Sequence, residues 1–381
     1  MRQSFNARTE TYLDWNATTP LRPEAAAAMS AMLASCGNPS SVHRWGRAAR
    51  QGAEHARSAV GGLLHAPADG VVFVSGGTEA NHLALLGSGR DRILVSAVEH
   101  DSVLHAVPKA ERIPVDQDGV VMLDTLDRLL SDDPRPALVS VMFANNETGV
   151  VQPVAAISAL AREYGALFHC DAVQAAGKIE LDAGTIGADL ITLSAHKLGG
   201  PPGVGALVVT GELDVMPLLR GGGQEHRRRA GTENLPGIAG FAAAAGAAKE
   251  EISVYDRLRA LRDTLEERVV AAAPEAVVLG ARAERLPNTA AIAMPGIAAE
   301  TQVIALDLDG VMVSAGAACS SGKVGPSHVL EAMGLGSDLV GSTIRVSLGW
   351  ASSEADVAHF LEAWTALYRR CRGSYARRRA A

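Results

Sequence analysis

Short apolar runs alternate with helix-like segments between about residues 70 and 210. The strand candidates among them are residues 71–74, 93–96, 138–142, 167–169, 190–193 and 205–209. Intervening segments such as 154–164 carry apolar residues at helical spacing. Continuous apolar strands that alternate with helices predict an α/β domain whose mostly parallel sheet is buried on both faces.

Further helical patterns flank this core. Ala-rich amphipathic segments at 24–33 and 43–64 precede it, and one long helical stretch at 236–272 follows it, ending before Pro274. The remaining chain predicts a second, smaller α+β unit, with strand candidates at 290–294, 311–314 and 344–348 and helix candidates at 300–308 and 354–368. We therefore expect a large domain of residues 16–250 and a small domain formed by residues 1–15 and 251–381.

Composition narrows the class of protein. Hydrophobic residues make up 48% and charged residues 20% of the 381 residues, and the net charge of −7 provides no general attraction to nucleic acid or anionic membranes. The chain has no apolar run of about 18 residues and no apolar core of a signal peptide near Met1. The four cysteines form no metal-binding spacing. We expect a cytoplasmic protein with reduced thiols and no metal site.

Polar groups follow four consecutive strand candidates. Lys197 and Asp171 come after two of them, and His100 and the segment 145–149 follow two others. Open α/β sheets bind ligands at the carboxyl ends of their strands. A lysine that can form a Schiff base and an aspartate that can pair with a pyridinium nitrogen indicate pyridoxal phosphate (PLP). The alternatives are a helix cap for Asp171, a structural role for His100 and a simple turn at 145–149.

A glycine-rich turn at residues 75–81 follows a strand candidate and opens a helical segment. Its glycines permit close backbone approach, and the helix N-terminus favours an anion, so Gly77 and Thr78 are candidates for binding phosphate. Ser194 and His196, beside the lysine, could supply further donors. A tight strand-to-helix turn without a ligand explains the same residues.

Two later segments add candidate chemistry. Residues 221–232 combine a run of three glycines with three arginines and a closing Gly-Thr, which fits either a solvated basic loop or an anion-binding loop. Cys319 lies among small residues from 313 to 322. Because bulky apolar neighbours would normally bury such a thiol, this context indicates a mobile nucleophile, with a small-residue packing site as the alternative.

Together these residues resemble a cysteine desulfurase of the NifS/IscS type, within the class V aminotransferase-like PLP enzymes. The resemblance runs from residues 12–20 to residues 342–349. It rests on these motifs: Gly37 to Ser41, the turn from Ser75 to Glu79, Glu99 with His100, Asn145 to Gly149, Asp171 with Gln174, and Ser194 to Lys197. It implies an aspartate aminotransferase-like fold with a seven-stranded sheet, and a homodimer that releases alanine from L-cysteine.

The resemblance also implies a role for each matching residue. Lys197 would carry PLP and move the substrate's α-proton, Asp171 would hold the pyridine nitrogen, and His100 would stack on the ring as a further catalytic residue. Gln174 and Asn146 would also contact the cofactor. Gly77, Thr78, Ser194 and His196 would bind its phosphate, together with Thr232 of the partner subunit.

The substrate side of the resemblance involves three further positions. Arg345 would bind the substrate carboxylate, with Asn38 nearby. Cys319 would attack the substrate sulfur and pass it, as a persulfide, to an acceptor protein of iron–sulfur cluster assembly or tRNA thiolation. The Cys319 context resembles the long-loop subgroup.

The chain departs from the family in two places. Residues 226–229 read His-Arg-Arg-Arg where the family has an arginine-glycine run, and the last residues are rich in arginine. A selenocysteine lyase, or another class V PLP lyase, is an alternative that keeps the PLP chemistry. A non-catalytic protein that binds RNA or a partner through the arginine-rich tail is a remote one.

Overall fold

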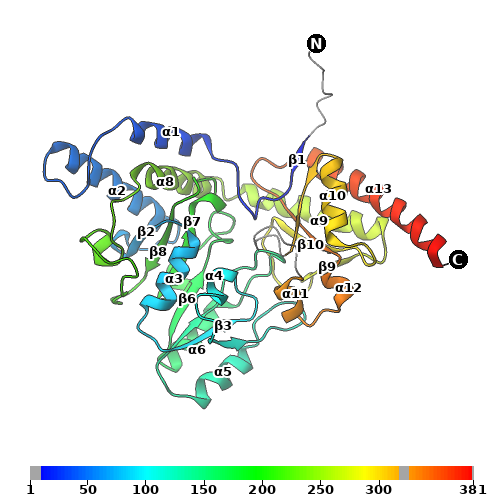
Figure 1. The fold of residues 1–381 in the computed structure, drawn as a ribbon, viewed down its shortest axis with the longest axis horizontal. Helices are drawn as coiled ribbons and strands as arrows, with labels where there is room; N and C mark the ends of the chain where they lie inside the picture. The colour runs from blue at the N-terminus through cyan, green and yellow to red at the C-terminus, as the bar shows by residue number, and fades with distance from the viewer. Residues whose placement is uncertain (1–9, 317–325, 380–381) are drawn as a thin grey trace, which may run out of the picture.

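The described chain contains a seven-stranded sheet, a four-stranded sheet and a separate pair of strands, with helices packed around them (Figure 1). The computed structural model describes residues 10–316 and 326–379. The larger sheet has seven strands in the order β2 (Val71–Val74), β8 (Gly205–Val209), β7 (Leu190–Ser194), β6 (Leu167–Asp171), β5 (Ala137–Ser140), β3 (Arg92–Ser96) and β4 (Glu111–Ile113). All neighbours are parallel except β8, which runs antiparallel to β2 and β7. The predicted α/β class with a mostly parallel seven-stranded sheet is confirmed.

Helices cover both faces of this sheet because its strands are apolar on both sides. Phe73, Phe168 and Ile191 pack on one face with α2 (Arg44–Gly62), α5 (Leu123–Asp132), α6 (Val154–Glu163) and α8 (Leu235–Glu250). The opposite face packs against α3 (Gly77–Gly87) and α4 (Asp101–Leu104). Helix α1 (Pro23–Leu33) lies on α8, and α7 (Ala183–Ile186) contacts α6.

The smaller sheet is antiparallel, in the order β12 (Ser314–Ala315), β13 (Thr343–Ser347), β10 (Thr289–Ala293) and β9 (Val277–Leu279). A separate parallel pair joins β1 (Thr11–Tyr12) to β11 (Val311–Met312). Helices α9 (Val254–Ala272), α10 (Ala299–Leu308) and α13 (Glu354–Arg379) complete this core. Two short helices, α11 (His328–Ala332) and α12 (Ser337–Val340), lie at the bottom of the right-hand part of the molecule in Figure 1. The small α+β unit is thus confirmed, while its limits in sequence stay a prediction.

Two predicted elements are wrong in their extent. The helix expected at 236–272 is two helices, because α8 ends at Glu250 and α9 begins at Val254. Arg22 holds Glu251 at this junction through a 2.6 Å ion pair, and the break lets α8 pack on the large sheet and α9 on the small one. The strand expected at 311–314 is split between β11 and β12, which pair with different partners. Within the described ranges, no helix is long and apolar enough to cross a membrane.

Candidate active site

A cavity of about 330 Å³ opens at the carboxyl ends of β7, β6, β5 and β3. It brings together all the predicted site residues except three: Gly77, Thr78, His100, Asn146, Asp171, Gln174, Ser194, His196, Lys197 and Arg345. They meet because each follows a strand of the large sheet or, for Arg345, lies on β13 of the small one. The exceptions are Asn38, Thr232 and Cys319.

Lys197 reaches the cavity from a short 3₁₀ turn, Ala195–Lys197, that follows β7. Its Nζ donates to the backbone oxygens of Asn16 at 2.7 Å and Ala17 at 2.8 Å. Asn16 was not among the predicted site residues, although the motif at 12–20 contains it. Its contacts cannot be read from spacing, since Lys197 is 181 residues away.

A buried polar cluster lies behind the lysine. The Lys178 Nζ donates to Asn16 Oδ1 at 2.8 Å and to Gln174 Oε1 at 2.7 Å. Burial, reinforced by the charges of Lys197 and Arg345, holds the pKa of Lys178 well below its usual range. Since the Gln174 oxygen accepts from Lys178, the amide nitrogen is the donor: it donates one N–H to the Asn16 backbone oxygen at 3.0 Å and has a second N–H left to donate. This orientation suits an acceptor such as a phenolic oxygen.

Asp171 ends β6 with both carboxylate oxygens engaged. Oδ1 accepts from the Val173 amide at 3.0 Å, and Oδ2 accepts from Asn81 Nδ2 at 2.8 Å. A turn rather than a helix follows Asp171, so the alternative of a helix cap is wrong. His100 lies at the next wall of the cavity, and burial lowers its pKa against the opposing charge of Asp171.

The start of α3 forms the end of the cavity suited to phosphate. A β-carbon at Gly77 would lie 3.2 Å from Val173 Cγ2 and 3.5 Å from Ser194 Cβ, so a larger residue would press on Val173 at this end of the cavity. Thr78, Ser194 and His196 also line it. Burial lowers the pKa of His196 to about 4, so its ring is neutral at pH 7. Amides, hydroxyls and a helix N-terminus fit the phosphate of PLP.

Arg345 is 2% exposed and is held from two sides. Its Nη2 donates to Asp14 Oδ1 at 2.6 Å and its Nη1 to the Asn146 oxygen at 3.0 Å. Its Nε is buried without a hydrogen-bond partner among the described residues. A buried guanidinium with an unused donor in a cavity wall suits a carboxylate ligand.

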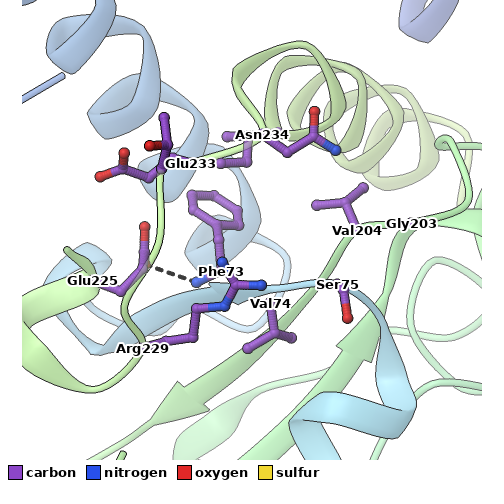
Figure 2. Close-up of a pocket in the computed structure, with 11 residues that line it drawn as sticks. Phe73, Val74, Ser75, Gly203, Val204, Glu225, Arg229, Glu233 and Asn234 are labelled. Atoms are coloured by element: carbon purple, nitrogen blue, oxygen red, sulfur yellow. Dashed lines mark hydrogen bonds between the residues drawn. The ribbon is translucent and has the colours of Figure 1, made fainter. Parts of the chain in front are cut away.

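The structure places two of the predicted residues outside this cavity. Thr232 lines a separate cavity of about 180 Å³, shown in Figure 2. Asn38 lies between α1 and α2, where its side chain accepts from the Ser40 amide at 2.9 Å. Cys319 lies outside the described residues.

The arginine loop is tied to acidic side chains. Arg229 pairs with Glu79 at 2.9 Å, and Glu225 accepts from Arg57 at 2.7 Å. Figure 2 shows Glu225 bonded to the Phe73 amide, a contact of 2.8 Å. Because Arg229 is already paired, this arginine is not a free anion-binding group within the chain.

Known proteins resemble this chain over most of its length. Residues 11–360 match the family model described as aminotransferase class-V. A cysteine desulfurase of Cereibacter sphaeroides is 44% identical over 369 residues, covering 92% of this chain and 94% of that protein. The solved structure of a NifS-like protein from Rickettsia africae ESF-5 has a TM-score of 0.89 at 34% identity, covering 95% of this chain and all of that one (100%). SspA, solved in complex with cysteine, has a TM-score of 0.77 at 26% identity, covering 89% and 98% of the two chains.

Proposed function

The chain belongs to the class-V aminotransferase family, and from that premise we propose that it is a cysteine desulfurase. It removes the sulfur of L-cysteine, releases L-alanine and passes the sulfur on through Cys319. The observation that carries the proposal is the meeting of Lys197, Asp171 and Arg345 in one cavity, because these groups suit a PLP enzyme that acts on an amino acid.

PLP, when bound, supplies an aldehyde that condenses with amines and a pyridinium ring that withdraws electrons. In the proposal Asp171 keeps a proton at the ring nitrogen, and Asn81 holds the Asp171 carboxylate in place through its 2.8 Å bond. Gln174 donates to the phenolic oxygen, His100 and Asn146 contact the ring, and the start of α3 binds the phosphate. Lys197 would hold the aldehyde end of the cofactor, and its amine would move the substrate's α-proton.

Arg345 binds the substrate carboxylate in this proposal, with Asp14 fixing its orientation. The solved complex of the related SspA with cysteine supports cysteine as the substrate class. Asn38 is a further candidate for the substrate side, and its position between α1 and α2 leaves that role a proposal.

Cys319 takes the sulfur: its Sγ forms an S–S bond as the substrate's carbon–sulfur bond breaks, and the carbon product leaves as alanine after protonation. The persulfide then reaches an acceptor protein of iron–sulfur cluster assembly or tRNA thiolation. We include a cytoplasmic location, supported by the thiols of Cys36, Cys170 and Cys371, which form no disulfide.

A homodimer is part of the proposal. Thr232 does not line the cavity of its own chain, which supports a role at the phosphate of the partner's site. Leu33, Val42 and Trp45 are 69%, 85% and 51% exposed, which a second copy could cover.

The test is to load the purified protein with PLP, add L-cysteine and measure alanine and persulfide. We expect both products from the wild type, and neither from Lys197→Ala, which should also lack the absorbance of lysine-bound cofactor. Cys319→Ala should keep that absorbance and lose persulfide. Undiminished alanine from Cys319→Ala would instead favour a class V lyase that needs no cysteine, and absence of alanine from the loaded wild type would contradict the proposal.

A further inference from the structure

A chain of hydrogen bonds connects Asp171 to His100 through Asn81, which holds the Asp171 carboxylate, and through Ser102, which has no role assigned so far. Asn81 Nδ2 donates to Asp171 Oδ2 at 2.8 Å and to Ser102 Oγ at 2.9 Å. Ser102 in turn contacts His100 Nδ1 twice, through its Oγ at 2.8 Å and its backbone amide at 3.1 Å. Asn81 and Ser102 are 1% and 7% exposed, so no bulk water competes for these bonds.

The direction of every bond in this chain is fixed. A backbone amide can only donate, so His100 Nδ1 must be an acceptor and carries no proton. The Ser102 hydroxyl can then donate to the same nitrogen while it accepts from Asn81. The neutral ring therefore carries its proton on Nε2.

Asp171 fixes the orientation of the Asn81 amide. Turning the amide over would place its oxygen against the Asp171 carboxylate, where two acceptors repel. The observed orientation leaves Asn81 Oδ1 buried without a partner in the described part of the chain. Leaving a buried acceptor unpaired is costly, so the bonds to Asp171 and Ser102 outweigh that loss.

We propose that Asn81 and Ser102 are positioning residues that hold His100 as its neutral Nε2–H tautomer and couple its ring to the Asp171 carboxylate. The coupling runs over three elements, because Asp171 ends β6, Asn81 lies on α3, Ser102 lies on α4 and His100 directly precedes α4. The consequence for catalysis rests on the proposed function: His100 can donate a proton only from Nε2, and protonation of Nδ1 would break the bond that Ser102 donates.

Other charged groups also act on the His100 ring. Burial lowers its pKa most, while Asp171 and Asp101 raise it and Lys197 and His328 lower it. The network adds a preference for the neutral ring, because both bonds to Nδ1 require that nitrogen to be unprotonated. Removing the network should therefore raise the pH at which His100 becomes charged.

The test compares variants of the full-length, PLP-loaded protein. Ser102→Ala and Asn81→Leu break the chain at two points, and Ser102→Thr keeps the hydroxyl. Ser140→Ala is a matched control, since Ser140 on β5 makes a buried 2.9 Å bond to His169 on β6, and neither residue lines the cavity. Nitrogen NMR of labelled histidine rings reports the tautomer and titration of His100, and the missing signals of His100→Gln identify it.

For the wild type and Ser140→Ala we expect an Nε2–H signal at neutral pH and the same titration midpoint. Ser102→Ala should raise that midpoint by about 0.5–1 pH unit, the equivalent of one lost hydrogen bond to Nδ1. Asn81→Leu should raise it in the same direction, because the Ser102 oxygen no longer accepts from Asn81 and can accept from a protonated Nδ1 instead. Ser102→Thr should restore it. The acid limb of alanine formation should move in the same direction and by the same amount.

An Nδ1–H or charged His100 in the wild type at pH 7.5 would overturn the inference. Midpoints in both variants equal to that of Ser140→Ala would do so too. The NMR measurement needs no turnover, so it stands apart from the proposed activity. A loaded protein with the expected His100 signals but no alanine would contradict the desulfurase function and leave the network intact.

Discussion

Three successive residues without glycine's freedom adopt left-handed backbone angles in the arginine loop. Glu225, His226 and Arg227 have φ values of 46°, 54° and 65°. Each such residue costs about 1–2 kcal/mol relative to a right-handed conformation. The Glu225 carboxylate, buried against Arg57 and the Phe73 amide, offsets this cost and holds the turn. The loop is therefore fixed at Glu225. Arg227 is exposed, and no side-chain hydrogen bond or ion pair within the described residues offsets its backbone strain.

Replacing Arg227 with glycine should stabilise the protein. We expect Arg227→Gly to raise the free energy of unfolding by up to about 1 kcal/mol, because glycine adopts positive φ without a clash, although it adds entropy to the unfolded chain. Urea denaturation at fixed protein concentration measures the change. The neighbouring Arg228 has a φ of −85°, so Arg228→Gly is the matched control and should lower stability. Equal effects of the two changes would contradict the argument.

The sequence predicts a site residue where a reactive side chain stands at, or directly after, the end of a strand. Lys197 and Asp171 satisfy this condition, and both line the cavity. Asn16, Lys178 and Ser102 do not, because their importance comes from partners that only the fold brings near. Lys178 meets Asn16 across 162 residues of sequence, and an isolated lysine after a glycine is otherwise typical of a surface turn.

At the scale of elements, the turn after β5 links the cavity to the chain on either side of the Cys319 segment. Asn145 Oδ1 shapes this turn by accepting from the amides of Glu147 and Thr148 at 2.9 and 3.0 Å. Glu147 Oε2 then accepts from Ser327 Oγ at 2.6 Å, just before α11. A β-carbon at Gly316 would lie 2.5 Å from the same Oε2, so the carboxyl group also abuts the end of β12.

The buried Glu147 carboxyl group makes the free energy of unfolding depend on pH. Burial raises the pKa of Glu147 to about 7, against opposing effects of Ser327 and Arg345, and Asp101 adds to the rise. The folded protein therefore keeps a proton that the unfolded chain loses above about pH 4.5, and the free energy of unfolding falls as pH rises from there to about 7. The total loss is on the order of 3 kcal/mol.

Glu147→Gln should remove this dependence. Its stability relative to the wild type should increase by on the order of 2–3 kcal/mol between pH 5 and pH 8, measured by urea denaturation at both pH values. The exposed Glu250 offers a control, since Glu250→Gln should differ from the wild type by the same small amount at both. A Glu147→Gln difference that does not change with pH would exclude a raised pKa.

The hydrophobic pattern of the sequence predicts some helix and strand limits and misses others. The strands at 71–74 and 205–209 are found as predicted because both faces of each are buried. The break between α8 and α9 has no proline or glycine at residues 251–253, so its cause lies in packing on two different sheets. The strand β4 has only three residues and one buried apolar side chain, Ile113, too short a pattern to detect.

At the scale of the whole molecule, the cavity with Lys197 and the cavity with Thr232 have different walls. Only Thr232, among the residues predicted to bind phosphate, lies in the second. Ser75, which precedes Gly77 by two residues, lines the second cavity, so the turn that leads into α3 contributes to both cavities. In the proposed homodimer, Thr232 acts on the partner's site rather than on its own.

Mixed dimers show whether Thr232 binds PLP in the partner's site or in the site of its own chain. Thr232→Ala should weaken PLP binding by about tenfold, as expected for the loss of one hydrogen bond to a charged group. A dimer of one Thr232→Ala chain and one Lys197→Ala chain, purified by two tags, places both changes in one site if Thr232 acts across the interface. The other site then has Lys197 from one chain and an intact Thr232 from its partner, so half of the sites should bind PLP with wild-type affinity and form alanine.

If Thr232 acted within its own chain, the only site with Lys197 would bind PLP as weakly as the sites of the Thr232→Ala homodimer. A dimer of wild-type and Lys197→Ala chains sets the value expected for one intact site.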